Sequence, residues 1–373
     1  MNYVIHLTNR CNLRCKYCYE HKCNQDISFE NIKELIDYQI SRKESSSFIN
    51  FFGGEPLLKK DLIKDTINYI KAANTDTEFY YGMTTNGTLI DDDFINFVKE
   101  NNFLHIAYSI DGDKETQNIN RIATNGEGSF NIVEKNAKKI LSQIDNVIAM
   151  PVITKNNLGN LSNNVKYLID LGFKKINLQF NYMDNWESED LPKIEEQYNE
   201  VAKIYENKLL QEENIDIFSI DKKIKTYIKK GYDCNNDCKL GMKSIDVGVD
   251  GDFYPCEQLV GNKQYVIGNC KTGIDEIARM KIVQEAKKEN EICKKCSIRN
   301  RCKHTCACMN YMLTKDINEL SPLVCETEKI IIRVADAMAE RLYKQSSDMF
   351  IQKFYNKDFD ILNSIANKRK EQK

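Results

Sequence analysis

The chain has 373 residues, a net charge of −2 at neutral pH and a sequence pI near 6.2. This length suggests two or three structural units with a substantial core. The balanced charge does not favour a nucleic-acid partner. Because the sequence has no apolar signal region and no apolar run long enough to span a bilayer, we also expect no membrane partner and a cytoplasmic location.

The first half of the sequence alternates short β-rich runs with helical patterns. The expected strands are Tyr3–Thr8, Phe48–Phe52, Glu78–Thr84, Phe103–Ile110, Val147–Ile153 and Lys175–Phe180. The expected helices are Phe29–Ile40, which Ser28 would cap, Leu62–Ala72, Phe94–Val98, Ile132–Leu141 and Leu161–Leu171. Six β–α units in series predict an α/β fold with a parallel sheet, and periodicity alone leaves a doubly wound sheet and a barrel open.

Three cysteines lie within one stretch of eight residues after the first expected strand: Cys11, Cys15 and Cys18. The chain has fourteen cysteines and no secretion signal, which is typical of metal ligands rather than disulfides. Three thiols at this spacing can hold three corners of an iron–sulfur cube and leave the fourth iron open for a small molecule. Cys23 as a fourth ligand, or a zinc site that includes His21, is the alternative.

Cys11-x3-Cys15-x2-Cys18, with Tyr17 just before the third cysteine, resembles the signature of the radical S-adenosylmethionine (SAM) enzymes. The resemblance implies that SAM binds the open iron of a [4Fe–4S] cluster. One electron then releases a 5′-deoxyadenosyl radical, which abstracts a hydrogen atom. It also implies a partial (β/α)6 TIM-like barrel, with the chemistry at the C-terminal ends of the strands. Because exposed clusters are oxygen-sensitive, we expect an anaerobic setting.

Polar motifs follow several of the expected strands. By resemblance, Gly53-Gly54-Glu55-Pro56 meets the SAM amino group, and Arg121 meets its carboxylate. The full set of SAM contacts that the resemblance implies is Tyr17, Gly53, Gly54, Glu55, Pro56, Thr85, Asn86, Ser109, Arg121 and Leu178. A tight turn, a surface arginine and core packing of Leu178 are the structural alternatives. Asp111 could instead cap its loop, and we expect His6 and His105 to be core or lining histidines.

Residues 183–232 change character and are predicted to form a helical linker, with helices over Ile194–Leu210 and Ile220–Lys229. Trp186 is expected to anchor a loop. The predicted domains are a barrel over 1–182, this linker, a cysteine-rich domain over 233–326, and a C-terminal helix and tail over 327–373. The helix itself is predicted over Lys329–Leu342 and is expected to pack against the barrel.

The cysteine-rich domain resembles the SPASM domain of peptide-modifying radical SAM enzymes, which carries two auxiliary [4Fe–4S] clusters. Paired structural zinc sites are the alternative. By resemblance, the first auxiliary cluster is held by Cys234, Cys238, Cys256 and Cys306, and the second by Cys293, Cys296, Cys302 and Cys325. If Cys234 does not bind, the first cluster has an open iron for a substrate thiolate. Glu257 is a candidate base, and Cys23, Cys270 and Cys308 are expected to be inert thiols.

The resemblance implies a maturase of a cysteine-containing precursor peptide that joins a cysteine sulfur to a carbon as a thioether. A sulfatase-maturating enzyme that forms formylglycine, a peptide epimerase and a non-catalytic electron carrier are the alternatives. The turn Asp111-Gly112-Asp113-Lys114 departs from the His-Asp pattern typical of sulfatase maturation. Flavodoxin or ferredoxin is the expected electron donor. Because the sequence starts at the first barrel strand, the peptide leader is expected to bind either to the barrel and SPASM surfaces or to a separate peptide-recognition protein.

Overall fold

The computed structural model describes residues 1–20, 22–231, 240–286, 290–303 and 306–355. Contacts divide the chain into two compact units. Unit 1 comprises Met1–Met150, Cys238–Asn290 and Thr305–Leu320, and unit 2 comprises Pro151–Asp237, Glu291–His304 and Ser321–Lys373. The predicted domain boundaries follow sequence motifs rather than contacts, and they stay a prediction.

Unit 1 is built on a largely parallel sheet with the strand order β11-β10-β1-β2-β3-β4-β5. Neighbours from β10 to β5 pair in parallel, and β10 with β11 forms an antiparallel hairpin. The strands are β1 (Asn2–His6), β2 (Ser46–Phe52), β3 (Glu78–Thr85), β4 (Phe103–Tyr108), β5 (Val147–Ala149), β10 (Ser244–Val247) and β11 (Phe253–Tyr254). Parallel order places all the β–α turns from β1 to β4 at one edge of the sheet.

Three helices of unit 1 begin at capping residues, of which the sequence predicted the first. Ser28 caps the first helix by accepting a hydrogen bond from the Asn31 amide, and Asp91 and Asp113 cap two others. Their apolar faces are buried while the opposite faces stay polar. The helices are α1 (Phe29–Ser41), α2 (Lys60–Ala72), α3 (Asp92–Glu100), α4 (Lys114–Asn120), α5 (Phe130–Leu141), α9 (Glu276–Glu285) and α11 (Ala307–Thr314). Of these helices, α4, α9 and α11 were not predicted from the sequence.

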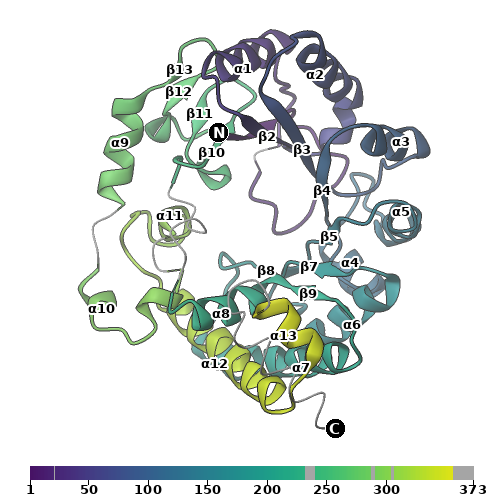
Figure 1. Ribbon diagram of the computed structural model, residues 1–373, viewed down its shortest axis with the longest axis vertical. Coiled ribbons are helices and arrows are strands. Elements are labelled where there is room, and N and C mark those ends of the chain that lie inside the picture. Colours follow the sequence, from purple (N-terminus) through teal and green to yellow (C-terminus); the bar gives the residue numbers. More distant parts are fainter. Residues whose placement is uncertain (21, 232–239, 287–289, 304–305, 356–373) are drawn as a thin grey trace. The chain divides into compact units, whose positions relative to one another are not determined.

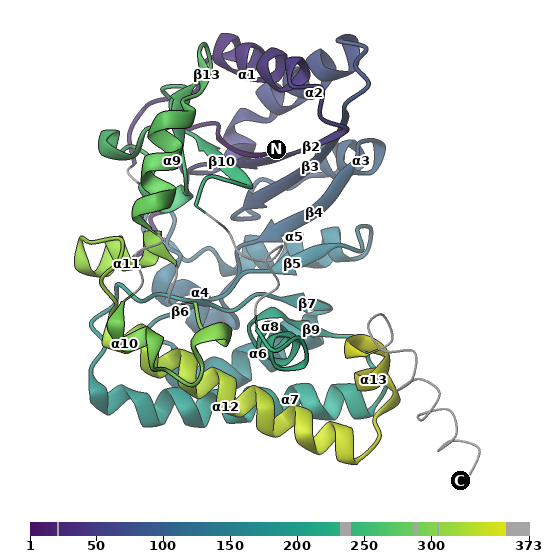
Figure 2. The same ribbon diagram turned by 60° about the vertical axis from the view of Figure 1, so that its left-hand side comes forward.

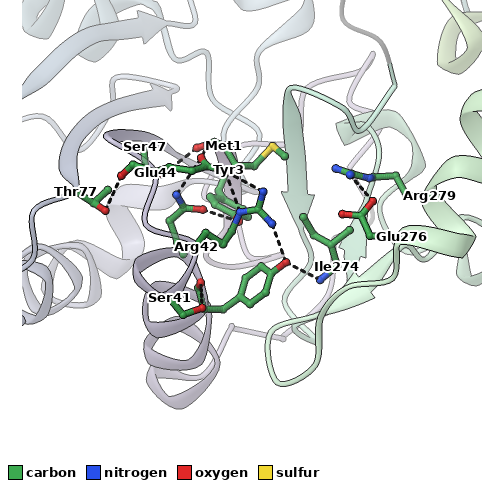
Figure 3. A network of polar contacts seen from close by, with 12 residues as sticks. Met1, Tyr3, Ser41, Arg42, Glu44, Ser47, Thr77, Ile274, Glu276 and Arg279 are labelled. Atoms are coloured by element: carbon green, nitrogen blue, oxygen red, sulfur yellow. Dashed lines mark hydrogen bonds and ion pairs between the residues drawn. The ribbon is translucent and has the colours of Figure 1, made fainter.

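The cysteine-rich segment joins the N-terminal sheet directly. Figure 1 shows the green β10 beside the purple β1, and residues Asn2–Ile5 pair with Ser244–Val247. A second hairpin, β12 (Gly268–Asn269) with β13 (Gly273–Ile274), lies against α1. There the Tyr38 hydroxyl accepts hydrogen bonds from the Ile274 amide and from Arg42, both at 3.2 Å (Figure 3). These residues, distant in sequence, therefore form one compact unit.

Unit 2 is mainly helical. The two long helices α7 and α12 run side by side, as both ribbon views show (Figures 1 and 2). Its helices are α6 (Leu161–Leu171), α7 (Leu191–Leu210), α8 (Phe218–Ile228), α10 (Glu291–Lys294), α12 (Pro322–Lys344) and α13 (Asp348–Phe354). The predicted C-terminal helix is longer than expected, since Pro322 starts α12 and Cys325 lies inside its first turns. None of the helices in the described ranges is both long enough and apolar enough to cross a bilayer.

Two expected strands are interrupted in the structure. Val147–Ile153 divides into β5 and β6 (Val152–Ile153), because Pro151 lacks the amide hydrogen that a strand ladder needs. Lys175–Phe180 divides into β7 (Lys175–Ile176) and β8 (Gln179–Phe180). These two short strands pair with different partners, β7 with β9 (Asp216–Ile217) and β8 with β6.

A buried ion pair holds the cysteine loop of unit 2. Lys223 on α8 and Glu328 on α12 pair at 2.6 Å, and their side chains are 2% and 3% exposed. Lys223 also donates to the carbonyl of Arg301, and Glu328 accepts from the amide of Lys303 at 2.8 Å. The peptide groups on both sides of Cys302 are therefore fixed by charged side chains of two helices.

Removing one member of this ion pair should leave the other charge buried without its counter-charge. We expect Lys223→Met to lower the free energy of unfolding by about 3–5 kcal/mol, because Glu328 then stays buried and unpaired. Thermal unfolding of the purified chain measures this. Lys166→Met is the matched control, since Lys166 pairs with Asp170 on an exposed helix face and should change stability by less than about 1 kcal/mol. Equal effects of the two substitutions would contradict the assignment.

Candidate active site

The cysteine loop of unit 1 is pinned by backbone hydrogen bonds to the segment after α4. Leu13 forms an isolated bridge with Ala123, and the Lys16 amide donates to the carbonyl of Asn120 at 3.0 Å. The Leu13 side chain is buried, whereas Cys11 and Cys15 are partly exposed and Cys18 is exposed. The loop is thus anchored by its apolar residue, while its three thiols stay at least partly accessible.

The glycine motif packs directly on the chain that enters this loop. The Gly54 amide donates to the Thr8 carbonyl at 2.7 Å, and the Glu55 amide donates to the Arg10 carbonyl at 2.9 Å. A Cβ atom at Gly53 would stand 2.5 Å from the Thr8 carbonyl oxygen, and one at Gly54 would stand 2.1 Å from that of Arg10. Gly53 also has a φ of +121°. Only glycine allows this approach.

Glu55 carries a fully buried carboxylate that joins the ends of two strands. It accepts hydrogen bonds from the Leu57 amide, the Thr85 hydroxyl and the Asn86 amide, at 3.0, 2.8 and 2.7 Å. Burial raises the pKa of Glu55 to about 7, and these hydrogen bonds limit the rise. All three of its described hydrogen bonds come from the protein, and its contact with the SAM amino group stays a prediction.

Asn86 lies against the first cysteine of the loop. Its side-chain amide donates to Asn12 Oδ1 at 2.9 Å and to Cys11 Sγ at 3.7 Å. The end of β4 is next to this site, because the Ser109 amide donates to the Thr85 carbonyl at 2.9 Å. The ends of β3 and β4 and the cysteine loop therefore meet at one edge of the sheet. Their contacts with SAM stay predictions.

Arg121 is buried, so it is not the surface arginine that was one alternative. Its Nε donates to Asp111 Oδ1 at 3.0 Å, and Asp111 Oδ2 accepts from the Tyr17 hydroxyl at 2.7 Å. The guanidinium also stands 5.3 Å from the centre of the Tyr17 ring. Asp111 therefore links the aromatic residue of the cysteine motif to Arg121. The sequence analysis missed this role.

The cysteine loop suits an iron–sulfur cube, because it offers three thiols that can each bind a different iron. In the described ranges, no group of three or more His, Cys, Asp or Glu side chains is placed to hold one ion. A cube differs because each cysteine binds its own iron, so the thiols stand apart. All the described cysteines are free thiols. Cys23 hydrogen-bonds with Asn9 and Gln25.

Two predicted ligands of the first auxiliary cluster, Cys256 and Cys306, lie in unit 1, and Cys234 and Cys238 lie outside the described residues. A hydrogen bond with Cys308, together with burial, raises the pKa of Cys256. Cys308 is thus a neighbour of a predicted ligand, although the sequence analysis treated it as an inert thiol. Burial and nearby Asp246 raise the pKa of Glu257 to about 7.

The predicted ligands of the second auxiliary cluster all belong to unit 2. Cys293 lies in α10, Cys296 and Cys302 follow it in the sequence, and Cys325 lies in α12. Burial, with the nearby Cys296 thiol, raises the pKa of Cys325. Leu178, the predicted adenine contact, is a buried residue of unit 2. Trp186 anchors its loop as expected, donating from Nε1 to the Asn181 carbonyl at 2.7 Å.

Comparison with known proteins finds two family matches. The radical SAM superfamily model matches residues 5–178, and the model of an iron–sulfur cluster-binding domain, SPASM, matches residues 238–297. An uncharacterised protein of Methanocaldococcus jannaschii is 36% identical over 46% of this chain, and the chain spans 60% of its length. A cysteine-type anaerobic sulfatase-maturating enzyme of Clostridium novyi is 28% identical over 70% of this chain and 74% of its own.

Two solved structures share the fold. Native anSMEcpe with bound AdoMet has a TM-score of 0.76 at 21% identity, covering 92% of this chain and 99% of that one. Streptococcus suis SuiB bound to precursor peptide SuiA has a TM-score of 0.61 at 16% identity, covering 87% and 75%. The predicted α/β fold class, with its partial barrel, is confirmed by the first of these likenesses.

The packing of Gly54 gives a direct test of the site. We expect Gly54→Ala to lower stability by about 1–3 kcal/mol and to reduce iron at the cysteine loop, because its Cβ would meet an immobile backbone carbonyl. Thermal unfolding and iron analysis measure both effects. The control is Gly159→Ala, whose Cβ would find its nearest neighbour, a lysine side-chain carbon, at 3.9 Å. A Gly54 variant with wild-type iron and stability would refute this packing role.

Proposed function

We propose a peptide-modifying reaction for this chain, which belongs to the radical SAM superfamily and carries a SPASM iron–sulfur domain. The chain is an enzyme that uses SAM and [4Fe–4S] clusters. One cluster binds SAM, and the auxiliary clusters belong to the SPASM domain. Its product, in this proposal, is a thioether between a cysteine sulfur and a carbon of a precursor peptide. The observation that carries the proposal is the meeting of the three-cysteine loop with Glu55 and Asn86 in a chain that also has a SPASM domain.

The residues of the site have separate tasks in this proposal. Cys11, Cys15 and Cys18 hold the SAM-binding cluster, and the GGEP backbone with Glu55 receives the SAM amino group. Asn86 and Ser109 bind its hydroxyl and carboxylate groups. Arg121 suits the SAM carboxylate because it is already buried and oriented by Asp111. When bound, SAM and the reduced cluster supply a 5′-deoxyadenosyl radical, and the auxiliary clusters supply an acceptor for one electron.

Thioether formation requires the peptide to lose one hydrogen atom, one proton and one electron. The hydrogen atom leaves the carbon, the proton leaves the cysteine thiol, and the carbon–sulfur bond forms. We assign Glu257 as the base that accepts this proton, because Glu257 follows Cys256 directly and its carboxyl group lies beside Asp246. An open iron in the first auxiliary cluster could hold the substrate thiolate instead. Flavodoxin or ferredoxin is the proposed electron donor, and a separate peptide-recognition protein is a proposed partner.

A peptide substrate has support from the relatives. The structure of SuiB has been solved with a precursor peptide, and that of anSMEcpe with a peptide named Cp18Cys. The second candidate function is sulfatase maturation, which the relatives from Clostridium novyi and Clostridium perfringens favour. The turn from Asp111 to Lys114 departs from the pattern that the resemblance gives for that function.

Mass spectrometry of a peptide treated with the reduced enzyme separates the candidates. We expect a mass loss of two hydrogens with one fewer free thiol, since one C–H and one S–H bond are replaced by a C–S bond. Loss of sulfur with a new aldehyde would establish formylglycine instead. An unchanged mass with altered retention would establish epimerisation. Peptides encoded beside the gene are the first substrates to test.

The cysteine loop itself can be tested without a peptide. We expect Cys15→Ala to abolish release of 5′-deoxyadenosine while the auxiliary iron stays bound, because the loop then lacks one of three ligands. Anaerobic reconstitution with dithionite and SAM, followed by chromatography and iron analysis, measures both. Cys23→Ala is the control and should keep SAM cleavage. Full cleavage by the Cys15 variant would overturn the site, and no cleavage by the wild-type chain would favour a non-catalytic electron carrier.

A further inference from the structure

A buried histidine lies between two carboxylates at the end of β1. His6 is 0% exposed; its Nδ1 lies 3.7 Å from Glu20 Oε1, and its Nε2 lies 3.7 Å from Asp246 Oδ1. Glu20 follows the last cysteine of the N-terminal loop by two residues, and Asp246 lies on β10. All three belong to unit 1. The sequence analysis expected His6 to be a core or lining histidine and did not predict these partners.

The geometry favours a charged imidazole. Both ring nitrogens and Asp246 Oδ1 are buried without a hydrogen-bond partner within the described residues. A neutral ring would leave two largely buried carboxylates on either side of an uncharged group, which is costly in a low-dielectric interior. A cation between them lowers that cost. Burial lowers the pKa of His6, but Asp246 and Glu20 outweigh this effect and raise the pKa to about 9.

The three residues connect two parts of the site. Glu20 ends the cysteine loop, whereas Asp246 begins the hairpin of β10 and β11 that leads to Cys256 and Glu257. We propose that His6 is a positioning residue which, as a cation between Glu20 and Asp246, ties the cysteine loop to this hairpin and so couples SAM cleavage to modification of the peptide. This inference rests on the proposed function. His6 contacts neither the substrate nor the reacting atoms.

The charge of His6 can be tested without any substrate. His6 has a raised folded-state pKa, so its stabilisation is complete below about pH 6.5 and is lost as the pH rises through about 9. The other ionisable groups that act on these three residues are Glu257 near Asp246 and His6, Tyr19 near Glu20 and Asp246, Cys256 near Asp246, and Lys22 near Glu20. We expect cluster-loaded His6→Gln to unfold roughly 3 °C or more below the wild type at pH 6.5. This gap should close by pH 9.5.

His105→Gln is the matched control for this measurement. His105 lies on β4 in the same sheet and stacks on Phe48 at 5.5 Å between ring centres. Any loss of stability in that variant should be the same at pH 6.5 and at pH 9.5. A gap between His6→Gln and the wild type that is constant from pH 6.5 to 9.5 would overturn the charged tie.

Coupling is read from the amount of 5′-deoxyadenosine formed per modified peptide. We expect His6→Gln to raise this ratio at least fivefold while iron content and peptide-free SAM cleavage stay within twofold of the wild type. Asp246→Asn should raise the ratio as well, because it removes the carboxylate through which His6 holds β10. The ratio should stay unchanged in His105→Gln.

Two results would overturn the coupling role. One is a wild-type ratio in His6→Gln. The other is loss of iron in both the His6 and Asp246 variants, which would give His6, Glu20 and Asp246 a purely structural role. The two proposals can also fail separately. If the wild-type chain modifies no peptide, the proposed function and the coupling role fall together, whereas the pH dependence of unfolding still decides whether His6 is charged.

Discussion

The close approach of the glycine motif to the chain entering the cysteine loop is the constraint on which the site depends. Two backbone hydrogen bonds and the absence of a Cβ atom fix Gly53 and Gly54 against Thr8 and Arg10. The same short segment carries Glu55, whose carboxylate then reaches the ends of both β2 and β3. Moving this backbone by the width of a methyl group would displace the cysteine loop and the carboxylate together.

Charged side chains do the remaining positioning around the loop. Asp111 holds both Tyr17 and Arg121, so the aromatic residue of the cysteine motif and the predicted carboxylate-binding arginine share one anchor. His6 lies between Glu20 and Asp246 at the other end of the same loop. Buried ionic groups of this kind contribute little net stability, but they fix orientation, because each is costly to leave unpaired. The site thus relies on them for geometry more than for energy.

Much of the fold and the cysteine motifs could be predicted from the sequence, since they depend on local signals. Period-two runs gave β1 to β4, and Ser28 gave the start of α1. The break at Pro151 was visible as a proline and was overlooked. The pairing of β10 with β1 and the contact of His6 with Asp246 join residues about 240 positions apart, and no local pattern encodes such a pairing. Likewise, nothing near Asp111 indicates that it serves Tyr17.

The ion pair of Lys223 and Glu328 links the position of Cys302 to the packing of two helices. Lys223 on α8 holds the carbonyl of Arg301, and Glu328 on α12 holds the amide of Lys303. Because the two charges also bind each other, the backbone on both sides of Cys302 depends on the contact between α8 and α12. A substitution that shifts either helix would therefore displace a predicted cluster ligand without changing any cysteine.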